Sequence, residues 1–250
     1  MQMEKGIPNV VAGYYDAHAM AEHKRLDLAL CRIEFLSTLH LIDRYFPRQG
    51  SACDIGGATG RYSLEPLRRG YQCVLRDISV NEIAIAKTIL AQNGFNAACA
   101  EQGDATDLSQ LAAQQFDAGL LLGPMYHLSQ VQDRKRALGE FHRVLKYGAI
   151  GLIAFINTWG LLRTGINDFP TWYKTPGFAA SLLKPRSFSA PELSGFTECF
   201  WTTPIEASQE LSAAGFTLIS YAGVESFAAG MNTELTILKR EDRVNYERIA

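Results

Sequence analysis

The chain has 250 residues, 47% of them hydrophobic and 20% charged, which suits one large α/β domain with a substantial core. Its 24 Lys and Arg residues nearly balance 26 Asp and Glu residues, so the formal net charge is -2. This balance provides no basic surface for nucleic acid or an anionic membrane, and a small molecule is therefore the expected partner.

The first predicted elements are two helices between Tyr14 and about Phe46, of which the second ends at Pro47 and Gly50. The first carries a polar and aromatic cluster of Tyr14, Tyr15, Asp16 and His18. These helices either pack on a sheet as an ordinary amphipathic cap or close over a ligand.

A glycine-rich turn follows a short apolar strand and leads into a helix near Arg61-Tyr62. Its sequence is Cys53-Asp54-Ile55-Gly56-Gly57-Ala58-Thr59-Gly60. The three glycines and Ala58 leave little side-chain bulk, so a ligand can lie against the backbone and the first helical amides can donate to it. The last gap is one residue shorter than in the Gly-x-Gly-x-x-Gly of dinucleotide-binding proteins, and no Walker-type Gly-Lys-Ser/Thr follows. The turn predicts a site for an anionic or strongly polar ligand end.

Two aspartates follow the next predicted strands. The expected elements are a helix over 61–69, a strand over 71–76, a helix over 80–92 capped by Ser79, and a strand over 97–100. Asp77 ends the first of these strands, and Gly103-Asp104-Ala105 follows the second. Ligands of open α/β sheets bind beyond the carboxyl ends of the strands, where a carboxylate can accept both hydroxyls of a ribose. Alternatively, Asp77 is a solvated aspartate at the end of a strand, and Asp104 only starts a turn before Leu108.

The apolar run Ala118–Leu122 predicts a fourth strand that is buried on both faces. It ends in Gly123-Pro124-Met125-Tyr126-His127-Leu128, and a fifth strand is expected over Ile150–Ile156. His127 is the only histidine predicted at the carboxyl end of a strand.

From Asn157 to about Thr203 the pattern breaks into a stretch rich in proline and aromatic residues. This stretch is too long for a plain loop and too apolar for a linker, so it predicts an inserted lid or substrate cap. The core resumes with a helix over 204–214 closed by Gly215 and with two strands, over 217–223 and 234–238.

Neither the N-terminus nor the cysteines indicate secretion. Residues 1–20 contain no apolar signal-peptide core, and no segment is long and apolar enough to span a bilayer. The five cysteines form no Cys-x-x-Cys pair, so neither a disulfide framework nor a metal site is predicted. We expect a cytoplasmic protein without a bound metal.

These motifs, in their order and spacing, resemble those of class I S-adenosylmethionine-dependent methyltransferases of the bacterial small-molecule type. The turn from Asp54 to Gly60 resembles the first family motif, and Phe141–Gly148 is similar to the helix end before the fifth strand. Ala58 replaces the middle glycine of the motif, and Tyr147 stands where the family often has proline, which affects turn stiffness rather than chemistry. The resemblance covers roughly residues 50–157 well and 204–240 loosely.

The resemblance implies S-adenosyl-L-methionine as the cofactor. The glycine turn then holds its methionine half, Asp77 its ribose and Asp104 with Ala105 its adenine, while the segment after the fourth strand faces the transferring methyl group. The cofactor-binding residues implied in this way are Tyr15, Arg25, Asp54, Gly56, Gly57, Gly60, Asp77, Ile78, Asp104, Ala105, Leu122 and Gly123.

The implied fold is a single α/β domain with a Rossmann-like, seven-stranded, mostly parallel sheet in the order 3-2-1-4-5-7-6. Within it we expect a helical N-terminal cap over 1–47, a cofactor-binding core over 48–156, the inserted lid over 157–203 and a C-terminal part of the core over 204–250.

The implied function is transfer of a methyl group to an oxygen or nitrogen of a small aromatic or heterocyclic metabolite. An imidazole with the ordinary pKa near 6.5 suits removal of a proton at neutral pH, so His127 is the candidate base and Tyr126 its catalytic neighbour. Alternatively, His127 packs under the helix that begins at Val131 and only shapes the loop. Tyr126 either stacks on the acceptor or covers the cofactor sulfur.

Three other functions stay open. An RNA or protein methyltransferase would share the cofactor site, although the acidic balance disfavours RNA. A nicotinamide oxidoreductase would need the longer glycine spacing. A non-catalytic S-adenosylmethionine-binding protein would carry the same motifs, because these motifs say nothing about turnover. The sequence does not indicate an oligomeric state.

Overall fold

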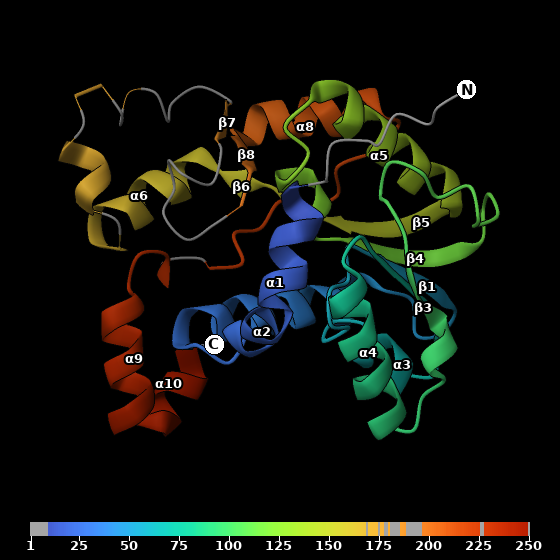
Figure 1. Cartoon of the computed structure of the whole chain (residues 1–250), viewed down its shortest axis with the longest axis horizontal. Helices are drawn as coiled ribbons and strands as arrows, with labels where there is room; N and C mark the ends of the chain where they lie inside the picture. Colours follow the sequence, from blue (N-terminus) through green and yellow to red (C-terminus); the bar gives the residue numbers. More distant parts are fainter. Residues whose placement is uncertain are drawn as a thin grey trace.

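A computed structural model describes residues 10–168, 170–174, 176–177, 180, 186–188, 197–225 and 228–249. Its main sheet has five parallel strands in the order β3-β2-β1-β4-β5, and a smaller sheet has the order β6-β8-β7 (Figure 1). The strands are β1 (Ser51–Ile55), β2 (Gln72–Asp77), β3 (Ala100–Gln102), β4 (Phe116–Leu121), β5 (Leu145–Ile153), β6 (Ile156–Asn157), β7 (Arg186–Phe188) and β8 (Cys199–Thr202).

Helices cover both faces of the main sheet. The α-helices are α1 (Val10–Arg25), α2 (Ala29–Tyr45), α3 (Leu64–Arg68), α4 (Val80–Gln92), α5 (Val131–Val144), α6 (Thr158–Asp168), α8 (Pro204–Ala213), α9 (Asn232–Glu241) and α10 (Arg243–Ile249). Short 3₁₀ helices are η1 (Ala97–Cys99), η2 (Pro124–Tyr126) and η3 (Pro170–Lys174). Across the described ranges, no helix combines the length and the apolar character that crossing a membrane requires.

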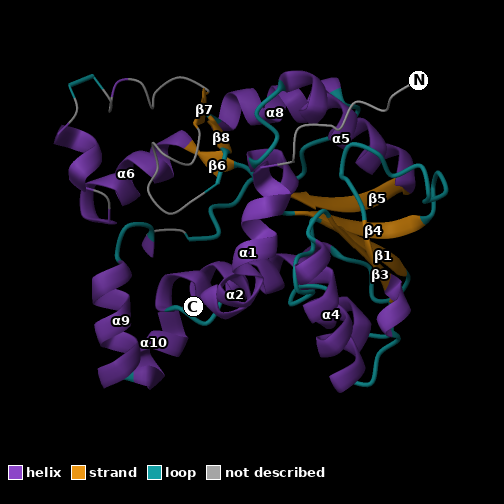
Figure 2. Ribbon diagram, in the orientation of Figure 1, coloured by secondary structure: helices purple, strands orange, loops and turns teal. Residues whose placement is uncertain are grey.

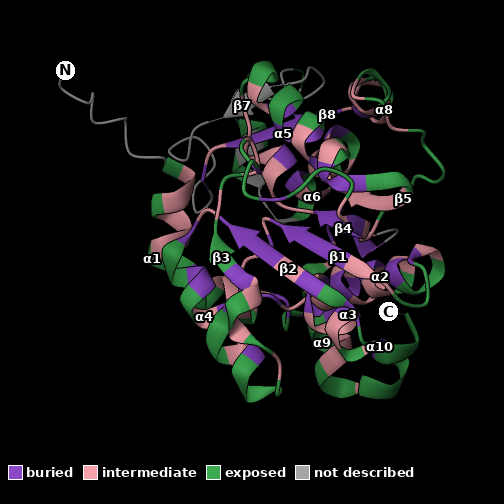
Figure 3. Ribbon diagram, turned by 90° about the vertical axis from the view of Figure 1, so that its right-hand side faces the viewer, coloured by how far each residue is buried: buried purple, intermediate pink, exposed green. Residues whose placement is uncertain are grey.

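The central strands are mostly apolar and buried because both of their faces are covered. On one face, Phe141 of α5 is fully buried in a cluster with Cys53 and Leu121. On the other face, Ile42 of α2 packs against Leu120. Figure 3 shows β2, β1 and β4 as almost entirely buried strands between these layers. Continuous apolar runs are typical of parallel strands in this position.

The predicted α/β class and the first five places of the predicted strand order are confirmed. The third strand is displaced: residues 97–99 form η1, and β3 begins at Ala100. The fifth strand starts earlier than expected, at Leu145, and ends at Ile153, while the last predicted residue, Ile156, belongs to β6. Asn96 explains the first shift, because its side chain accepts a hydrogen bond from the amide of Ala98 and begins a turn where a strand was expected.

The two C-terminal strands predicted over 217–223 and 234–238 are wrong. The first stretch is irregular and its Ile219 is 68% exposed, so its β-branched residues find no neighbouring strand to pack on. The second lies within α9, where Leu235 is buried against α2 and Tyr246 of α10 while Ile237 faces solvent. Residues 234–238 therefore follow a helical pattern of burial, and α9 with α10 packs on α2 rather than on the sheet.

The stretch predicted as a lid contains α6, η3, β7 and β8 among its described residues. Strand β8 pairs with β6, and its Trp201 is fully buried, so this end of the stretch is anchored beside α6 and α8 (Figure 2). Residues 169, 175, 178–179, 181–185 and 189–196 of the predicted lid lie outside the described residues. Closure of this stretch over a ligand stays a prediction.

Candidate functional site

The glycine turn forms a cradle at the carboxyl end of β1. Gly56 and Gly60 have positive φ angles of 72° and 79°, and a Cβ at Gly56 would clash with the ring of Pro124. A Cβ at Gly57 would lie 2.8 Å from Cγ of Asp54. Larger side chains would therefore fill the space between β1, β2 and the segment after β4.

The amides of this turn are used within the protein, contrary to the expectation that it presents amide donors. The amides of Gly56 and Gly57 donate to the carbonyl of Arg76, at 2.7 and 3.2 Å, and the amide of Gly60 donates to Gly57. The turn thus offers space more than hydrogen-bond donors to a ligand.

Asp54 lies beneath the cradle and is almost fully buried. The hydroxyl of Ser63 donates to its carboxylate at 2.6 Å. Burial raises the pKa of Asp54 to about 7, the Ser63 hydrogen bond opposes this shift, and the charge of Asp77 adds to it. Ser63 follows the turn directly, so this bond ties the start of α3 to β1.

Asp77 connects the glycine turn to the start of α4. Its two carboxylate oxygens accept hydrogen bonds from the amides of Ala58 and Ser79, each at 2.8 Å. Burial raises the pKa of Asp77, while these two hydrogen bonds lower it. A carboxylate has about four lone-pair directions, so both oxygens keep capacity for further donors.

Asp104 combines both roles that the sequence left open. Its Oδ1 accepts hydrogen bonds from the amide and the hydroxyl of Thr106, each at 2.8 Å, which makes a turn after β3. Asp104, Ala105 and Ile78 nevertheless line the same cavity as the glycine turn. This cavity has a volume of about 1840 Å³ and also reaches α1, α2 and the segment after β4.

Helix α1 closes one side of the cavity through polar contacts. Asp16 accepts from the Ser79 hydroxyl at 2.6 Å and from the amide of Asn81 at 3.1 Å, and α1 lies beside α4 (Figure 3). His23 binds the hydroxyl of Thr59 in the glycine turn at 2.9 Å. The helix docks mainly through these bonds, since Ala19 is its one buried residue within the described part.

Tyr15 and His127 are far apart in the sequence but lie side by side in the wall of the cavity. The Tyr15 hydroxyl lies 2.8 Å from Nε2 of His127, and Nδ1 of His127 lies 2.9 Å from the carbonyl oxygen of Glu198. A carbonyl can only accept, so Nδ1 carries the proton and Tyr15 donates to Nε2. Burial lowers the pKa of His127 to about 4, although the Glu198 backbone opposes this shift. His127 is therefore neutral at pH 7.

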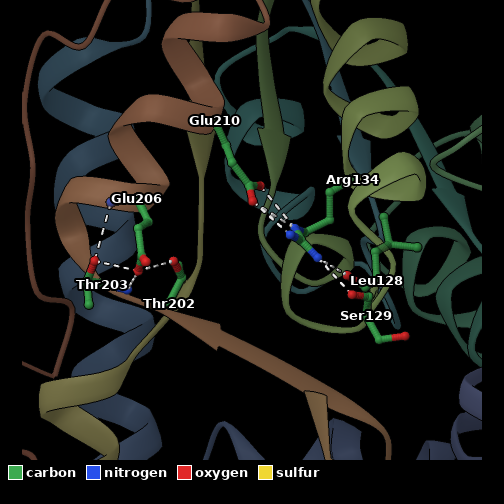
Figure 4. Close-up of polar contacts among 7 residues, drawn as sticks. All are labelled: Leu128, Ser129, Arg134, Thr202, Thr203, Glu206 and Glu210. Atoms are coloured by element: carbon green, nitrogen blue, oxygen red, sulfur yellow. Dashed lines mark hydrogen bonds and ion pairs between the residues drawn. The ribbon is translucent and has the colours of Figure 1, made fainter. Parts of the chain in front are cut away.

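An arginine holds the loop that carries His127. Arg134 of α5 is bound by the carboxylate of Glu210 on α8 at 2.8 Å, and it donates to the carbonyls of Leu128 and Ser129 at 3.0 Å (Figure 4). Glu210 is in turn fixed because α8 starts with a capping box, in which Thr203 and Glu206 bind each other's backbone amides (Figure 4). These bonds connect α5, α8 and the loop that carries Tyr126 and His127.

Arg25 lies between α1 and α2 with two carboxylates. Its Nε is 2.9 Å from Glu22, and its Nη1 is 3.4 Å from Glu34. Tyr62 and Tyr126 line the same part of the cavity, and burial raises the pKa of each phenol. Both tyrosines are therefore neutral hydrogen-bonding groups at pH 7.

Glu82 is a site residue that the sequence reading missed. Its side chain lines the cavity, it is 1% exposed, and its Oε1 has no hydrogen-bond partner among the described residues. Burial raises its pKa to about 9, and the charge of Asp77 adds to this shift. The pattern Ser79-x-x-Glu82 is a capping-box signature, in which the glutamate only caps the start of the helix. This pattern therefore does not indicate that Glu82 lies at a cavity.

The chain resembles known proteins in both sequence and structure. Residues 52–148 match the model of the family described as a methyltransferase domain. A SAM-dependent methyltransferase from Methanosarcina mazei is 26% identical, with a TM-score of 0.54, over 72% of this chain and 85% of that one. Residues 52–148 therefore form a methyltransferase domain. The predicted resemblance and the choice of S-adenosylmethionine as cofactor are confirmed.

Two further proteins resemble this chain. A glycine/sarcosine N-methyltransferase from Parasynechococcus marenigrum (strain WH8102) is 33% identical over 116 residues, which are 46% of this chain and only 41% of that relative. A Burkholderia thailandensis 1,6-didemethyltoxoflavin-N1-methyltransferase, solved with that compound and S-adenosylhomocysteine, shares the fold at 16% identity. Its TM-score is 0.58 over 92% of this chain and 88% of that one.

The fold places nearly all predicted site residues around one cavity. The residues that line it are Tyr15, Arg25, Asp54, Gly56, Gly57, Asp77, Ile78, Asp104, Ala105, Leu122, Gly123, Tyr126 and His127. Gly60 does not line it, and its positive φ instead allows the turn into α3. The cradle that a Cβ would fill and the spare acceptor capacity of Asp77 fit the cofactor. The role of each residue stays a prediction.

Asp16 provides a test of how α1 is held. Asp16→Ala removes the acceptor of two bonds at the start of α4, so we expect a loss of about 1 kcal/mol in the free energy of unfolding and weaker binding of S-adenosylhomocysteine. Denaturant unfolding and calorimetry measure the two effects. Asp16→Asn keeps an acceptor and serves as the matched control. Equal stability and affinity in Asp16→Ala would show that α1 is held by other contacts.

Proposed function

We propose that the protein transfers a methyl group from S-adenosylmethionine to a nitrogen or oxygen of a small aromatic or heterocyclic metabolite. The observation that carries this proposal is one cavity that is lined by the glycine cradle, by Asp77 and by the hydrogen-bonded Tyr15-His127 pair. The names of the two relatives above, an N-methyltransferase and an N1-methyltransferase, support nitrogen. Tyrosine and tryptophan side chains in the cavity wall support a flat acceptor.

The cofactor supplies, when bound, a methyl carbon that the acceptor lone pair attacks while the carbon–sulfur electron pair stays with sulfur. The protein has to align the acceptor and exclude water. Tyr15 donates its own proton to His127, so its phenol oxygen is left as an acceptor for an N–H or O–H group of the metabolite. The Glu198 carbonyl fixes the imidazole tautomer, and His127 thereby orients Tyr15. Tyr126 contacts His127 edge-on, with ring centroids 4.7 Å apart.

Calorimetry with the purified chain tests the cofactor. We expect S-adenosylmethionine and S-adenosylhomocysteine to bind and NAD not to bind, because the turn is too short for a dinucleotide pyrophosphate. Formation of S-adenosylhomocysteine with a panel of metabolites then separates an enzyme from a non-catalytic binding protein. Binding of NAD, or no binding of either sulfur compound, would reject the proposed function.

A further inference from the structure

Glu82 is a buried carboxyl group to which the reaction proposed above gives no task. It occupies the third position of α4, where a capping box would bind its carboxylate to the amide of Ser79. That amide instead donates to Asp77 at 2.8 Å. Glu82 thus belongs to the cavity wall, and its almost fully buried carboxyl group has an Oε1 without a hydrogen-bond partner in the described part of the chain. An orphaned buried oxygen of this kind costs stability unless a ligand satisfies it.

The walls around Glu82 carry more acidic than basic groups. Glu22 and Glu34 share the guanidinium of Arg25, so these three side chains together keep one negative charge in excess. Glu82 makes no ion pair with any described residue that compensates its own charge. The charged groups that act on it are Asp77 at the end of β2 and Asp16, Glu22 and Arg25 on α1.

Aromatic rings also line the cavity. Tyr15, Tyr62 and Tyr126 are among its lining residues. Burial raises the pKa of Tyr15 and Tyr126, and Glu82 lies near enough to both phenols to add to this shift. The face of an aromatic ring attracts organic cations, and carboxyl groups accept the N–H bonds of an ammonium ion. A phenolate or carboxylate ligand would instead meet like charge on Glu22 and Glu34.

We propose that the methyl acceptor is an amine, bound as a small organic ammonium ion whose N–H group is received by Glu82. This rests on the proposed function, because the acceptor must lie in the same cavity as the cofactor. When the cation binds, Glu82 loses its own proton to solvent. The carboxylate then takes one proton from the ammonium, and the freed nitrogen lone pair forms the bond to the methyl carbon. The product nitrogen keeps its remaining hydrogens and the positive charge.

The proton balance supports this assignment. Burial sets the pKa of Glu82 at about 9, near the value of about 10 for a simple alkylammonium, so a proton shared between them lies close to balance. The free protein therefore holds Glu82 protonated at neutral pH, and binding of a cation should release about one proton.

The test uses the full chain saturated with S-adenosylhomocysteine and two matched probes, benzylamine and benzyl alcohol. Calorimetry at pH 7.5 in phosphate and in Tris measures affinity and the number of protons released, since the two buffers differ in ionisation heat. We expect benzylamine to bind at least about tenfold more tightly than benzyl alcohol, with release of about one proton. Glu82→Gln should lose both effects, whereas Glu241→Gln, on the exposed face of α9, should keep them.

A second measurement separates recognition from a folding defect. The unfolded chain ionises Glu82 above about pH 4.5, while the folded chain keeps it protonated up to about pH 9, so this residue lowers stability as pH rises through that window. The melting temperature of ligand-free Glu82→Gln should therefore exceed that of the wild type, increasingly so toward pH 9.

Three results would overturn the inference: no benzylamine binding, equal binding of the two probes, or unchanged proton release in Glu82→Gln. Methyl transfer to phenols or alcohols alone would also overturn it while leaving the proposed function intact. Loss of S-adenosylhomocysteine binding in the wild type would instead reject the proposed function itself.

Discussion

Asp77→Ala should weaken the binding of S-adenosylhomocysteine by about 2 to 4 kcal/mol, which corresponds to about 30- to 900-fold in affinity. If Asp77 binds the ribose as the resemblance implies, the substitution removes two charge-assisted hydrogen bonds to the ribose hydroxyls. It also removes the acceptor for the amides of Ala58 and Ser79, so the glycine turn loses its link to α4. Both losses act on the same binding surface, which places the expected effect in the upper part of this range.

Two matched variants separate these contributions. Asp77→Asn keeps one oxygen for a backbone amide and should retain more affinity than Asp77→Ala. Asp43→Ala changes a carboxylate of α2 that is 73% exposed and should bind as the wild type does. Calorimetry on all three variants gives the comparison. Unchanged affinity in Asp77→Ala would remove Asp77 from the cofactor site.

The parts of the fold that could be predicted are those with local signals. The strand, glycine turn and helix from Ser51 to Arg68, and the Ser79 cap of α4, depend on residues that are neighbours in sequence. The C-terminal strands failed for the opposite reason. Thr236 and Ile237 favour a strand by propensity, but the buried position of Leu235 against α2 selects a helix, and that contact is not visible in the sequence.

The candidate site likewise contains residues whose position could be predicted from the sequence and contacts that could not. Asp54 and Asp77 lie at the carboxyl ends of β1 and β2, and Asp104 follows β3, so their common location follows from the topology of the parallel sheet. The contact between Tyr15 and His127 joins positions 112 residues apart, and no local pattern could have indicated it. Glu82 could not be predicted as a cavity residue, because its local pattern indicates a capping bond to the amide of Ser79 instead. The chain thus departs from its local pattern at the place where a ligand is expected to bind.

His127 has a large expected effect on turnover. His127→Ala should lower the rate by ~10²–10⁴-fold, because it removes the acceptor that orients the Tyr15 phenol and any proton transfer through the imidazole. His127→Gln should keep more activity, since a side-chain amide can still accept from Tyr15 and donate to the Glu198 carbonyl. The pH profile of turnover separates positioning from base catalysis: a base with a pKa of about 4 gives an acidic limb near pH 4 that both variants lose.

The stability of the same variants provides an independent check. The folded protein keeps His127 neutral down to about pH 4, whereas the unfolded chain takes up a proton below about pH 6.5. Neutral burial of His127 should therefore cost the wild type about 3 kcal/mol of unfolding free energy, relative to both variants, as pH falls through this window. Urea unfolding at pH 7 and pH 4.5 measures it. If both variants keep the wild-type rate and the same acidic limb, His127 is neither the base nor the residue that orients Tyr15, and alignment by Tyr126 becomes the better account.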